Sequence, residues 1–285
     1  MWVDRSGNEE LLGAPPRPYA FPRISPDGKQ IAVAVAGTND DIWTYDISRG
    51  TLTRLTFEAR SITPVWTADG KRIIYRSARA GTLNLFARAA DGSGGEERLT
   101  TSDMNQTPAD VSRDGQWLAF STGAQDVWVM PLAGDKKPRP FVQTPFSEVN
   151  GAFSPDGRWL AYHSNESGRN EVYVQPFPAG GGKVQVSPDG GMIPRWTSSN
   201  ELFYENGVKI MVVRMNAGPT LAVGKPQVAL DGQEYTAGLG LGAFDVTPDG
   251  KRLLMIKEPE QAASVTQINV VLNWLDEVAR LVPGR

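Results

Sequence analysis

A short turn motif recurs along the whole chain at a nearly constant interval. A hydroxyl residue is followed two positions later by Asp-Gly and usually by Lys or Arg. Glycine accepts the positive φ that a tight hairpin turn needs, so each copy predicts a hairpin between two strands. A fixed period of this kind indicates a repeat architecture. The clear copies are Ser25–Lys29, Thr67–Lys71, Ser112–Gln116, Ser154–Arg158 and Thr247–Lys251.

The interval also predicts a degenerate sixth copy near position 199. The last gap between clear copies spans 93 residues, which is two periods of about 44. Pro194–Thr197 repeats the approach to the turn seen at Pro64–Thr67, and Asn200 stands where Asp-Gly is expected. Asn is the non-glycine residue that best tolerates positive φ, so the turn is preserved. The out-of-phase motif Ser187–Gly190 is interpreted as a loop.

Four β-rich runs accompany each turn. Two apolar runs flank it, a third follows about 15 residues later, and a shorter polar run such as Thr53–Thr56 closes most repeats. Four antiparallel strands in roughly 40–45 residues form one blade of a β-propeller. The sequence therefore predicts an all-β protein, a six-bladed β-propeller of four-stranded antiparallel blades. The predicted blades, within a single domain 1–285, cover residues 19–58, 59–102, 103–146, 147–188, 189–234 and 235–285, with 1–12 closing the ring.

The two ends of the chain compete for places in the last blade. Trp2–Arg5 and Glu9–Leu12 flank a Ser-Gly-Asn turn, and Ile268–Leu272 offers one strand more than the blade can hold. Which run is displaced stays open. A short helix is expected after Asn273, ended by Pro283-Gly284. The recurring tryptophans expected to fill the space between blades are Trp43, Trp66, Trp117, Trp128, Trp159 and Trp196.

Composition narrows the chemistry that the chain can perform. It contains no Cys, which excludes disulfides, Cys nucleophiles and thiolate metal sites. A single histidine, His163, excludes a His-rich metal site. A net charge of −3 argues against broad attraction to nucleic acid or anionic membranes. No apolar run is long enough for a transmembrane helix, and Met1–Arg5 lacks the apolar segment typical of a signal peptide.

The motifs resemble a known family. The Asp-Gly hairpins, Val172–Val174 after Ser164–Arg169, and Pro194–Trp196 are similar to the TolB-like (WD-repeat-like) β-propeller family. The opening Trp2–Gly7 and the ending Val271–Leu275 resemble the subgroup found as the C-terminal domain of bacterial membrane-bound serine/threonine protein kinases. The resemblance implies a propeller that acts as a binding or sensing module. This chain has no kinase motif, so we do not expect it to phosphorylate anything by itself.

A hydrolase or lyase with a site at the channel mouth is the alternative. The chain has no Gly-x-Ser-x-Gly elbow, and the repeat places His163 near Glu205 of the next blade, a possible acid–base pair. The competing interpretation of His163 is a solvent-facing strand end. Gly238–Ala243 matches a dinucleotide-binding pattern but precedes a strand instead of a helix, so we interpret it as a loop. Asn39–Asp41 and Asn165–Glu171 offer oxygen ligands without EF-hand spacing, and solvated charges are the simpler interpretation.

The loops that lead into the inner strands converge on one mouth of the channel. Mixed aromatic, amide and charged side chains there suit a peptide or a small polar ligand. The alternative is that Arg23, Glu148 and Arg195 merely pair with each other. The predicted ligand-binding residues are Arg23, Asn105, Gln106, Glu148, Asn150, Arg195 and Tyr235.

The sequence thus predicts a non-catalytic binding or sensor module without a cofactor or a metal. Its partner is expected to be a protein, a peptide or a small molecule at one rim, and neither nucleic acid nor an inserted membrane. A third interpretation is a scaffold that assembles with other copies through its C-terminal helix. The compartment is extracytoplasmic if the chain derives from a membrane-bound kinase, and otherwise cytoplasmic.

Overall fold

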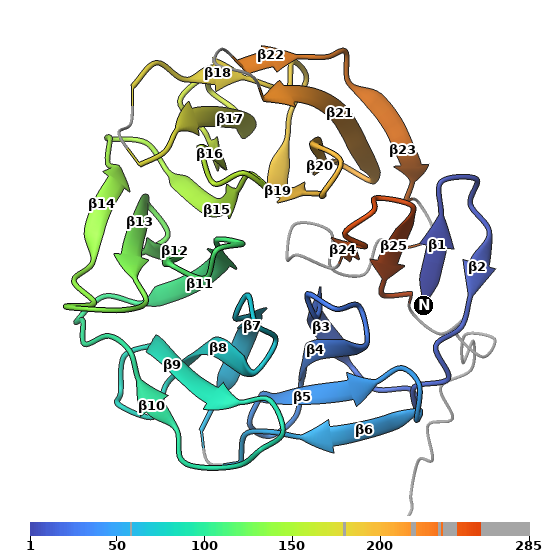
Figure 1. Ribbon diagram of the computed structural model, residues 1–285, viewed down its shortest axis with the longest axis vertical. Helices are drawn as coiled ribbons and strands as arrows, with labels where there is room; N and C mark the ends of the chain where they lie inside the picture. Colours follow the sequence, from blue (N-terminus) through green and yellow to red (C-terminus); the bar gives the residue numbers. More distant parts are fainter. Residues whose placement is uncertain (58, 179–180, 218–220, 233–234, 236–243, 258–285) are drawn as a thin grey trace, which may run out of the picture.

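Six antiparallel sheets surround a central axis in the computed structural model of the protein (Figure 1). The structure describes residues 1–57, 59–178, 181–217, 221–232, 235 and 244–257. Five sheets have four strands and the fifth blade has five. The predicted six-bladed β-propeller is therefore confirmed. The described part of the chain contains no α-helix, and the predicted helix after Asn273 and the strand Ile268–Leu272 lie outside the described residues.

The strands keep the same order in every blade, from the channel outward. The innermost strands are β3 (Tyr19–Ile24), β7 (Ser61–Trp66), β11 (Gln106–Val111), β15 (Glu148–Phe153), β19 (Met192–Trp196) and β24 (Phe244–Val246). The second strands are β4 (Gln30–Val35), β8 (Arg72–Ser77), β12 (Trp117–Thr122), β16 (Trp159–Ser164), β20 (Glu201–Asn206) and β25 (Arg252–Met255).

The outermost strand of each blade is shorter and more exposed than the third strand. The third strands are β5 (Asp41–Asp46), β9 (Asn84–Ala89), β13 (Asp126–Pro131), β17 (Glu171–Pro176), β21 (Lys209–Ala217) and β1 (Trp2–Asp4). The outer strands are β6 (Thr51–Arg54), β10 (Glu97–Arg98), β14 (Arg139–Val142), β18 (Val184–Gln185), β22 (Leu221–Val223) with β23 (Gln227–Asp231), and β2 (Glu9–Glu10). Short, charged outer strands protect the sheet edges from pairing with other chains.

The Asp-Gly turns join the first strand of each blade to the second. In the first turn Gly28 has a φ of 72°, and the Ser25 hydroxyl donates to Asp27 Oδ1 at 2.7 Å. The degenerate fifth turn has Asn200 at a φ of 58°. The prediction that Asn200 replaces glycine there is confirmed.

Apolar side chains gather between the blades. The buried apolar residues form six clusters, and each cluster joins two neighbouring blades. Ile42 of blade 1, for example, packs in one cluster with Ile73 and Tyr75 of blade 2. All six recurring tryptophans belong to these clusters or pack against them, as predicted. The core of the protein is therefore divided among the blade interfaces.

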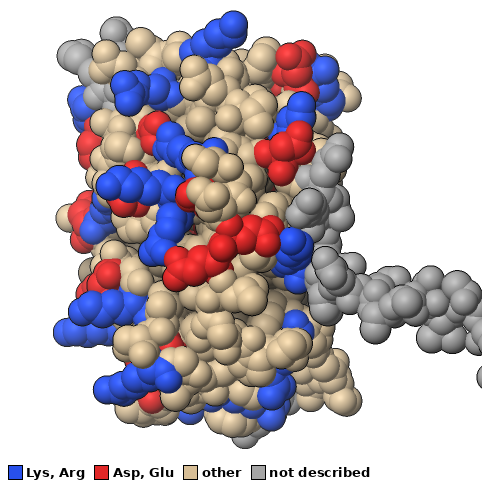
Figure 2. Space-filling view, turned by 90° about the vertical axis from the view of Figure 1, so that its right-hand side faces the viewer, with Lys and Arg blue, Asp and Glu red and all other residues tan. Residues whose placement is uncertain are grey.

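The N-terminal hairpin completes the sixth blade. β1 pairs with β25, with Trp2 opposite Leu254, and β2 forms the outer edge (Figure 1). This answers the question that the sequence left open, because both N-terminal runs serve as strands of the last blade. The side on which β1 and β2 lie mixes acidic and basic side chains instead of presenting one sign of charge (Figure 2). Within the described residues, no helix is long and apolar enough to cross a membrane.

A side chain of the N-terminal hairpin also ties blade 6 to blade 5. The Arg5 guanidinium donates through Nη1 and Nη2 to the two carboxylate oxygens of Glu201, and through Nε to Gly250 O at 2.8 Å. It also lies over the Phe203 ring, 5.2 Å from the centroid. A Cβ added at Gly250 would lie 2.9 Å from Arg5 Nη2 and 3.0 Å from Glu201 Oε2. Glycine is needed here both for the close approach and for its φ of 71°.

Substitution of Arg5 and Glu201 by Gln, singly and together, should reveal a coupling free energy of about 1 kcal/mol in urea unfolding. The pair is bidentate and joins two blades, but Arg5 is 38% exposed, so water screens part of the attraction. Gly250→Ala should cost about 1 kcal/mol or more, because alanine is strained at positive φ and displaces the ion pair.

Lys29→Gln provides the control for this cycle. Lys29 Nζ lies 3.9 Å from Asp27, and both side chains are mostly exposed, so the change in unfolding free energy should stay within about 0.5 kcal/mol. Strict additivity of the Arg5 and Glu201 substitutions would contradict a role of this ion pair in closing the ring.

Candidate ligand-binding channel

The inner strands of four blades are kinked near their middle. Their pairing with the second strand shifts register there, as between Ala20 and Arg23 of β3. The residue at the kink has a left-handed backbone, with φ between 52° and 58°. These residues are Phe21, Thr63, Asn150 and Ile193. A left-handed conformation is costly for branched or bulky residues, of order 1–3 kcal/mol, so the surrounding contacts must hold it in place.

Two of these kinks donate a hydrogen bond to the preceding blade. The Asn150 N–H donates to Ser121 Oγ at 3.4 Å, and the Ile193 N–H donates to His163 Nδ1 at 3.4 Å. Ser121 and His163 are the fifth residues of β12 and β16. The kinked backbone and the second strand of the neighbouring blade therefore position each other.

Blade 3 reverses this arrangement. Its inner strand has Pro108 near the register shift, and proline has no N–H to donate. The matching residue of blade 2 is Arg76, which donates from Nη1 to Thr107 Oγ1 at 2.8 Å. At the place where Ser121 and His163 accept a backbone hydrogen bond in other blades, Arg76 thus donates one, because Pro108 of the next blade has no N–H.

Four charged side chains from blades 1, 3, 5 and 6 meet in the channel. Each is the penultimate residue of its inner strand. We call Arg23, Asp110, Arg195 and Asp245 the channel quartet. Arg23 Nη2 lies 3.5 Å from Asp110 Oδ1, and Arg23 Nε lies 3.7 Å from Asp245 Oδ2. Arg195 Nε lies 3.8 Å from Asp245 Oδ1. Since blade 2 separates blades 1 and 3, Arg23 reaches Asp110 across the channel.

Backbone N–H groups hold both aspartates of the quartet. Asp110 Oδ2 accepts from the Phe153 N–H at 2.9 Å, and Asp245 Oδ2 accepts from the Ile24 N–H at 2.8 Å. In both cases the donor belongs to the next blade around the ring. Each carboxylate is therefore fixed in place, with its Oδ1 atom directed at an arginine.

The quartet is deep in the molecule and still reached by solvent. Its side chains retain 10% to 23% exposure. Burial lowers the pKa of Arg195 to about 10, an effect that the charge of Arg23 reinforces. Burial also raises the pKa of Asp110, against the opposing effect of Arg23. Both shifts disfavour the charged forms, so the four charges only partly compensate one another, which is common in functional sites.

The two ends of the channel differ. We call the end at which the inner strands begin the loop mouth, and the end with the Asp-Gly turns the turn mouth. At the turn mouth Arg113 of blade 3 donates to Ser198 Oγ of blade 5 at 3.0 Å. Because blade 4 lies between these blades, the contact spans the turn mouth. The quartet, at the penultimate positions of the inner strands, lies nearer to this end of the channel than to the loop mouth.

The structure brings two of the seven predicted site residues together. Arg23 and Arg195 both approach Asp245, so they do not pair with Glu148. Glu148 is buried, and its Oε1 accepts from the hydroxyls of Thr144 and Ser164. The alternative in which the two arginines pair with Glu148 is therefore wrong.

The other four predicted residues have hydrogen-bond partners outside the quartet. Gln106 is buried and accepts from the Thr100 hydroxyl. Asn105 Oδ1 accepts from the Leu83 N–H at 3.1 Å. Asn150 is half-buried at its kink. Tyr235 is buried and donates to Glu9 of the N-terminal hairpin.

His163 is buried in the interface of blades 4 and 5, so the interpretation as a solvent-facing strand end is wrong. Only 6% of its surface is exposed, and burial lowers its pKa to about 4. Glu205 has the matching place in blade 5 and is fully buried, and its charge favours the charged form of Arg195. A neutral histidine whose Nδ1 already accepts a backbone hydrogen bond is a weak general base.

The acidic loops considered as cation sites are occupied by ion pairs. Their carboxylates pair as follows: Asp40 with Arg60, Asp41 with Arg54, Glu166 with Lys183, and Glu171 with Arg169. No group of three or more His, Asp or Glu side chains suited to a metal ion occurs among the described residues. The glycines of 238–242 lie outside the described residues.

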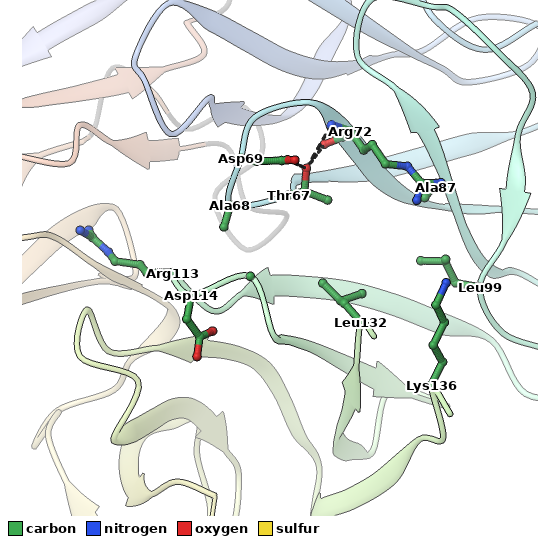
Figure 3. A pocket seen from close by; sticks show the side chains of 11 residues that line it. Thr67, Ala68, Asp69, Arg72, Ala87, Leu99, Arg113, Asp114, Leu132 and Lys136 are labelled. Carbon is green, nitrogen blue, oxygen red and sulfur yellow. Dashed lines mark hydrogen bonds between the residues drawn. The ribbon is translucent and has the colours of Figure 1, made fainter. Parts of the chain in front are cut away.

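A groove of about 510 Å³ lies between blades 2 and 3 on the side of the turn mouth (Figure 3). Arg72 and Lys136 at the groove both bind Glu97, at 2.6 and 2.8 Å. Asp69 accepts from the Thr67 hydroxyl at 2.6 Å. Because these charges are already matched by close partners, the groove is a weaker candidate than the channel quartet.

Sequence reasoning found the two arginines of the quartet and missed the two aspartates. A signal was present, since alignment of the repeats on their turns places Arg, Val, Asp, Ala, Arg and Asp in succession at the penultimate position. Opposite charges at equivalent positions of different blades indicate contact across the axis.

Comparison with known proteins relates part of the chain to a family. Residues 5–125 match the family described as PD40, TolB beta propeller domain. The chain is 32% identical to the Tol-Pal system protein TolB of Wolinella succinogenes over 188 residues, 57% of this chain and 42% of that protein. The structure of a putative TolB from Agrobacterium tumefaciens matches with a TM-score of 0.73 at 15% identity, covering 91% of this chain and 97% of that one. The chain is a six-bladed β-propeller, and its residues 5–125 are similar to the TolB beta propeller domain.

The propeller matches only part of some longer relatives. The uncharacterized peptidase YuxL of Bacillus subtilis is 29% identical over 152 residues, half of this chain and 21% of that protein. The chain likewise spans less than half of the W. succinogenes TolB. The similarity to the A. tumefaciens structure, at 15% identity, concerns the fold alone, and a fold does not determine an activity.

The buried His163 predicts a pH-dependent loss of stability. Its folded-state pKa of about 4 lies below the ordinary value of 6.5. As the pH falls below 6.5, His163 becomes protonated in the unfolded chain but stays neutral in the folded chain until the pH approaches 4. The stability due to neutral His163 is therefore complete above pH 6.5 and is lost as the pH approaches 4. At about 1.4 kcal/mol per pH unit, the loss is about 3 kcal/mol.

Urea unfolding of the wild type and of His163→Gln between pH 7 and pH 4 measures this effect. Glutamine retains an acceptor and removes the titration, so the stability of the wild type relative to the variant should fall by about 3 kcal/mol over the range. Ser121→Ala, at the matching place in blade 3, should show the pH dependence of the wild type. Parallel curves for wild type and His163→Gln would rule out the assignment.

Proposed function

We propose that this TolB-like propeller is a non-catalytic binding module that holds a segment of a partner protein, a peptide or a small polar ligand in its channel. The observation that carries the proposal is the channel quartet, whose charges meet at 3.5 to 3.8 Å and remain partly exposed. Charges that are fixed in a concave site and incompletely paired are suited to recognising a polar ligand. The residues proposed to frame the site are Asn105, Gln106, Glu148, Asn150 and Tyr235.

The binding role is favoured over the hydrolase or lyase alternative. The similarity to YuxL supports a link with peptidases, but the chain spans only 21% of that protein. The only histidine of the chain is a weak base with its Nδ1 in use. Acid–base catalysis at neutral pH favours a group whose pKa lies near the working pH. The name of the W. succinogenes relative, a Tol-Pal system protein, supports a protein as the partner here.

We further propose that the module is the sensor half of a bacterial serine/threonine kinase, on the opposite side of the membrane from the kinase domain. The similarity of Trp2–Gly7 and Val271–Leu275 to that subgroup supports this role. Immunoprecipitation of the native protein with an antibody against the propeller tests it. A species larger than 31.0 kDa with kinase activity is expected, and a native protein of 31.0 kDa without it would exclude the kinase role.

Selection of a random peptide library displayed on phage against the propeller tests the binding role. The enriched peptides should bind the wild type, and Arg23→Gln or Arg195→Gln should weaken their binding by about tenfold or more, because truncating a central arginine removes several donors at once. The dissociation constants of synthetic copies of the peptides, measured by calorimetry, provide the comparison.

Arg72→Gln is the matched control, because Arg72 lines the groove between blades 2 and 3 and not the channel. It should leave the affinities unchanged. Peptides that lose affinity with Arg72→Gln and not with Arg195→Gln would place the site in the groove and overturn the proposed role of the channel.

A further inference from the structure

The arginines of the channel quartet use few of their hydrogen-bond donors. A guanidinium has five N–H groups. Arg195 donates from Nη1 to Pro194 O at 3.2 Å, and its Nε atom is buried without a hydrogen-bond partner. Arg23 donates from Nη1 to Ala109 O at 2.9 Å and from Nη2 to Asp110 at 3.5 Å. Charge-assisted hydrogen bonds from guanidinium groups are normally about 2.7 to 2.9 Å long, so the contacts with the aspartates are loose.

Both guanidinium groups approach one carboxylate from different sides. Asp245 Oδ2 lies 3.7 Å from Arg23 Nε, and Asp245 Oδ1 lies 3.8 Å from Arg195 Nε. The Ile24 N–H holds Asp245 at 2.8 Å and keeps it from moving closer to either arginine. A carboxylate, Asp245, thus lies between Arg23 and Arg195 and contacts both arginines without binding either one closely.

We infer that the channel binds a carboxylate, which takes close hydrogen bonds from Arg195 and Arg23 that Asp245 does not take. The group belongs either to the C-terminus of a peptide or to an Asp or Glu side chain of one. This inference rests on the proposed binding function and specifies the ligand chemistry of the same site.

The composition of the channel favours a single negative charge. The quartet contains two positive and two negative side chains, and the charge of Glu205 also acts on Arg195, so net charge alone does not attract an anion. Asp110 and Asp245 repel a dianion such as a phosphate monoester more strongly than a carboxylate. The planar fork of a guanidinium also matches the planar carboxylate, to which it can donate two parallel hydrogen bonds. A cationic ligand would be repelled by the two arginines, and the Nε atom of Arg195 would stay without a hydrogen-bond partner.

NMR titration of the ¹⁵N-labelled protein, followed at the arginine Nε–H signals, tests the inference. The probes are acetate, methyl phosphate and three blocked tripeptides: acetyl-Gly-Gly-Gly with a free C-terminus, acetyl-Gly-Glu-Gly-amide and acetyl-Gly-Gln-Gly-amide. Acetate should shift the Arg195 signal saturably, and methyl phosphate should bind more weakly. The tripeptide with the free C-terminus and the Glu tripeptide identify which source of carboxylate is preferred, and the Gln tripeptide should not bind.

Three variants separate a ligand site from a purely structural ion-pair network. Arg195→Gln should weaken acetate binding by roughly tenfold, and Arg195→Lys, which keeps the charge, should also weaken it because the fork is lost. Asp245→Asn removes the competing charge and should tighten binding by roughly tenfold. Arg49→Gln, at a site 79% exposed on blade 1, should change nothing.

Three outcomes would overturn the inference. The first is an acetate-induced shift that does not saturate, and the second is an unchanged affinity for acetate in Asp245→Asn. The third is equal binding of the Gln and Glu tripeptides together with no preference for the tripeptide with the free C-terminus. If phage-selected peptides bind through Arg195 while carboxylates do not, the carboxylate is wrong and the binding function stands. If selection yields no peptide that depends on Arg195 or Arg23, the binding function fails, whatever the small probes do.

Discussion

The contact between each inner strand and the neighbouring blade is the constraint on which the rest of the structure depends. A single blade has two apolar faces and can bury them only against its neighbours, and the six apolar clusters lie at these interfaces. Polar contacts reinforce them beside the channel, through Ser121 and His163 on one side and Asp110 on the other. The left-handed backbone of Ile193, a branched residue, indicates that these contacts outweigh a local cost of order 1–3 kcal/mol.

The closure of the ring explains the departure of the fifth repeat from the pattern. A circular arrangement needs its last blade to contact both its predecessor and the first blade, and here the N-terminal hairpin supplies the outer strands of that blade. Arg5 of the hairpin requires a carboxylate on blade 5, which Glu201 provides directly after the irregular turn at Asn200. The regular Asp-Gly turn of blade 6 contributes Gly250, whose missing side chain leaves room for the same ion pair. What the sequence presents as a damaged repeat is thus part of a contact between blades.

The fold could be predicted from the sequence because its signal is local. The turn chemistry of Gly28 and of Asn200 is decided by residues within each turn, and the repeat count follows from their spacing. The composition of the last blade could not be predicted, because Trp2 and Val3 join the sheet by pairing with Leu254 and Leu253, about 250 positions away, and no local propensity indicates that pairing. Only half of the channel quartet could be predicted from the sequence. Arg23 and Arg195 stand out at the inner strands, whereas Asp110 meets Arg23 at a separation of 87 residues without a local pattern that pairs them.

Repetition and specificity occupy different positions of the same strands. The six clusters between blades consist of apolar residues, because each interface has to exclude water. The penultimate position of the inner strand differs among the repeats: Val65 and Ala152 belong to the apolar clusters between blades, whereas the other four blades carry the charged residues of the quartet there. Six equal charges at one axis would repel each other, and six apolar residues would leave the channel without any directional contact. The channel quartet, with both signs of charge, joins blades 1, 3, 5 and 6 and leaves Arg195 with unused hydrogen-bond donors. A ligand can therefore be recognised at the position where the repeats differ.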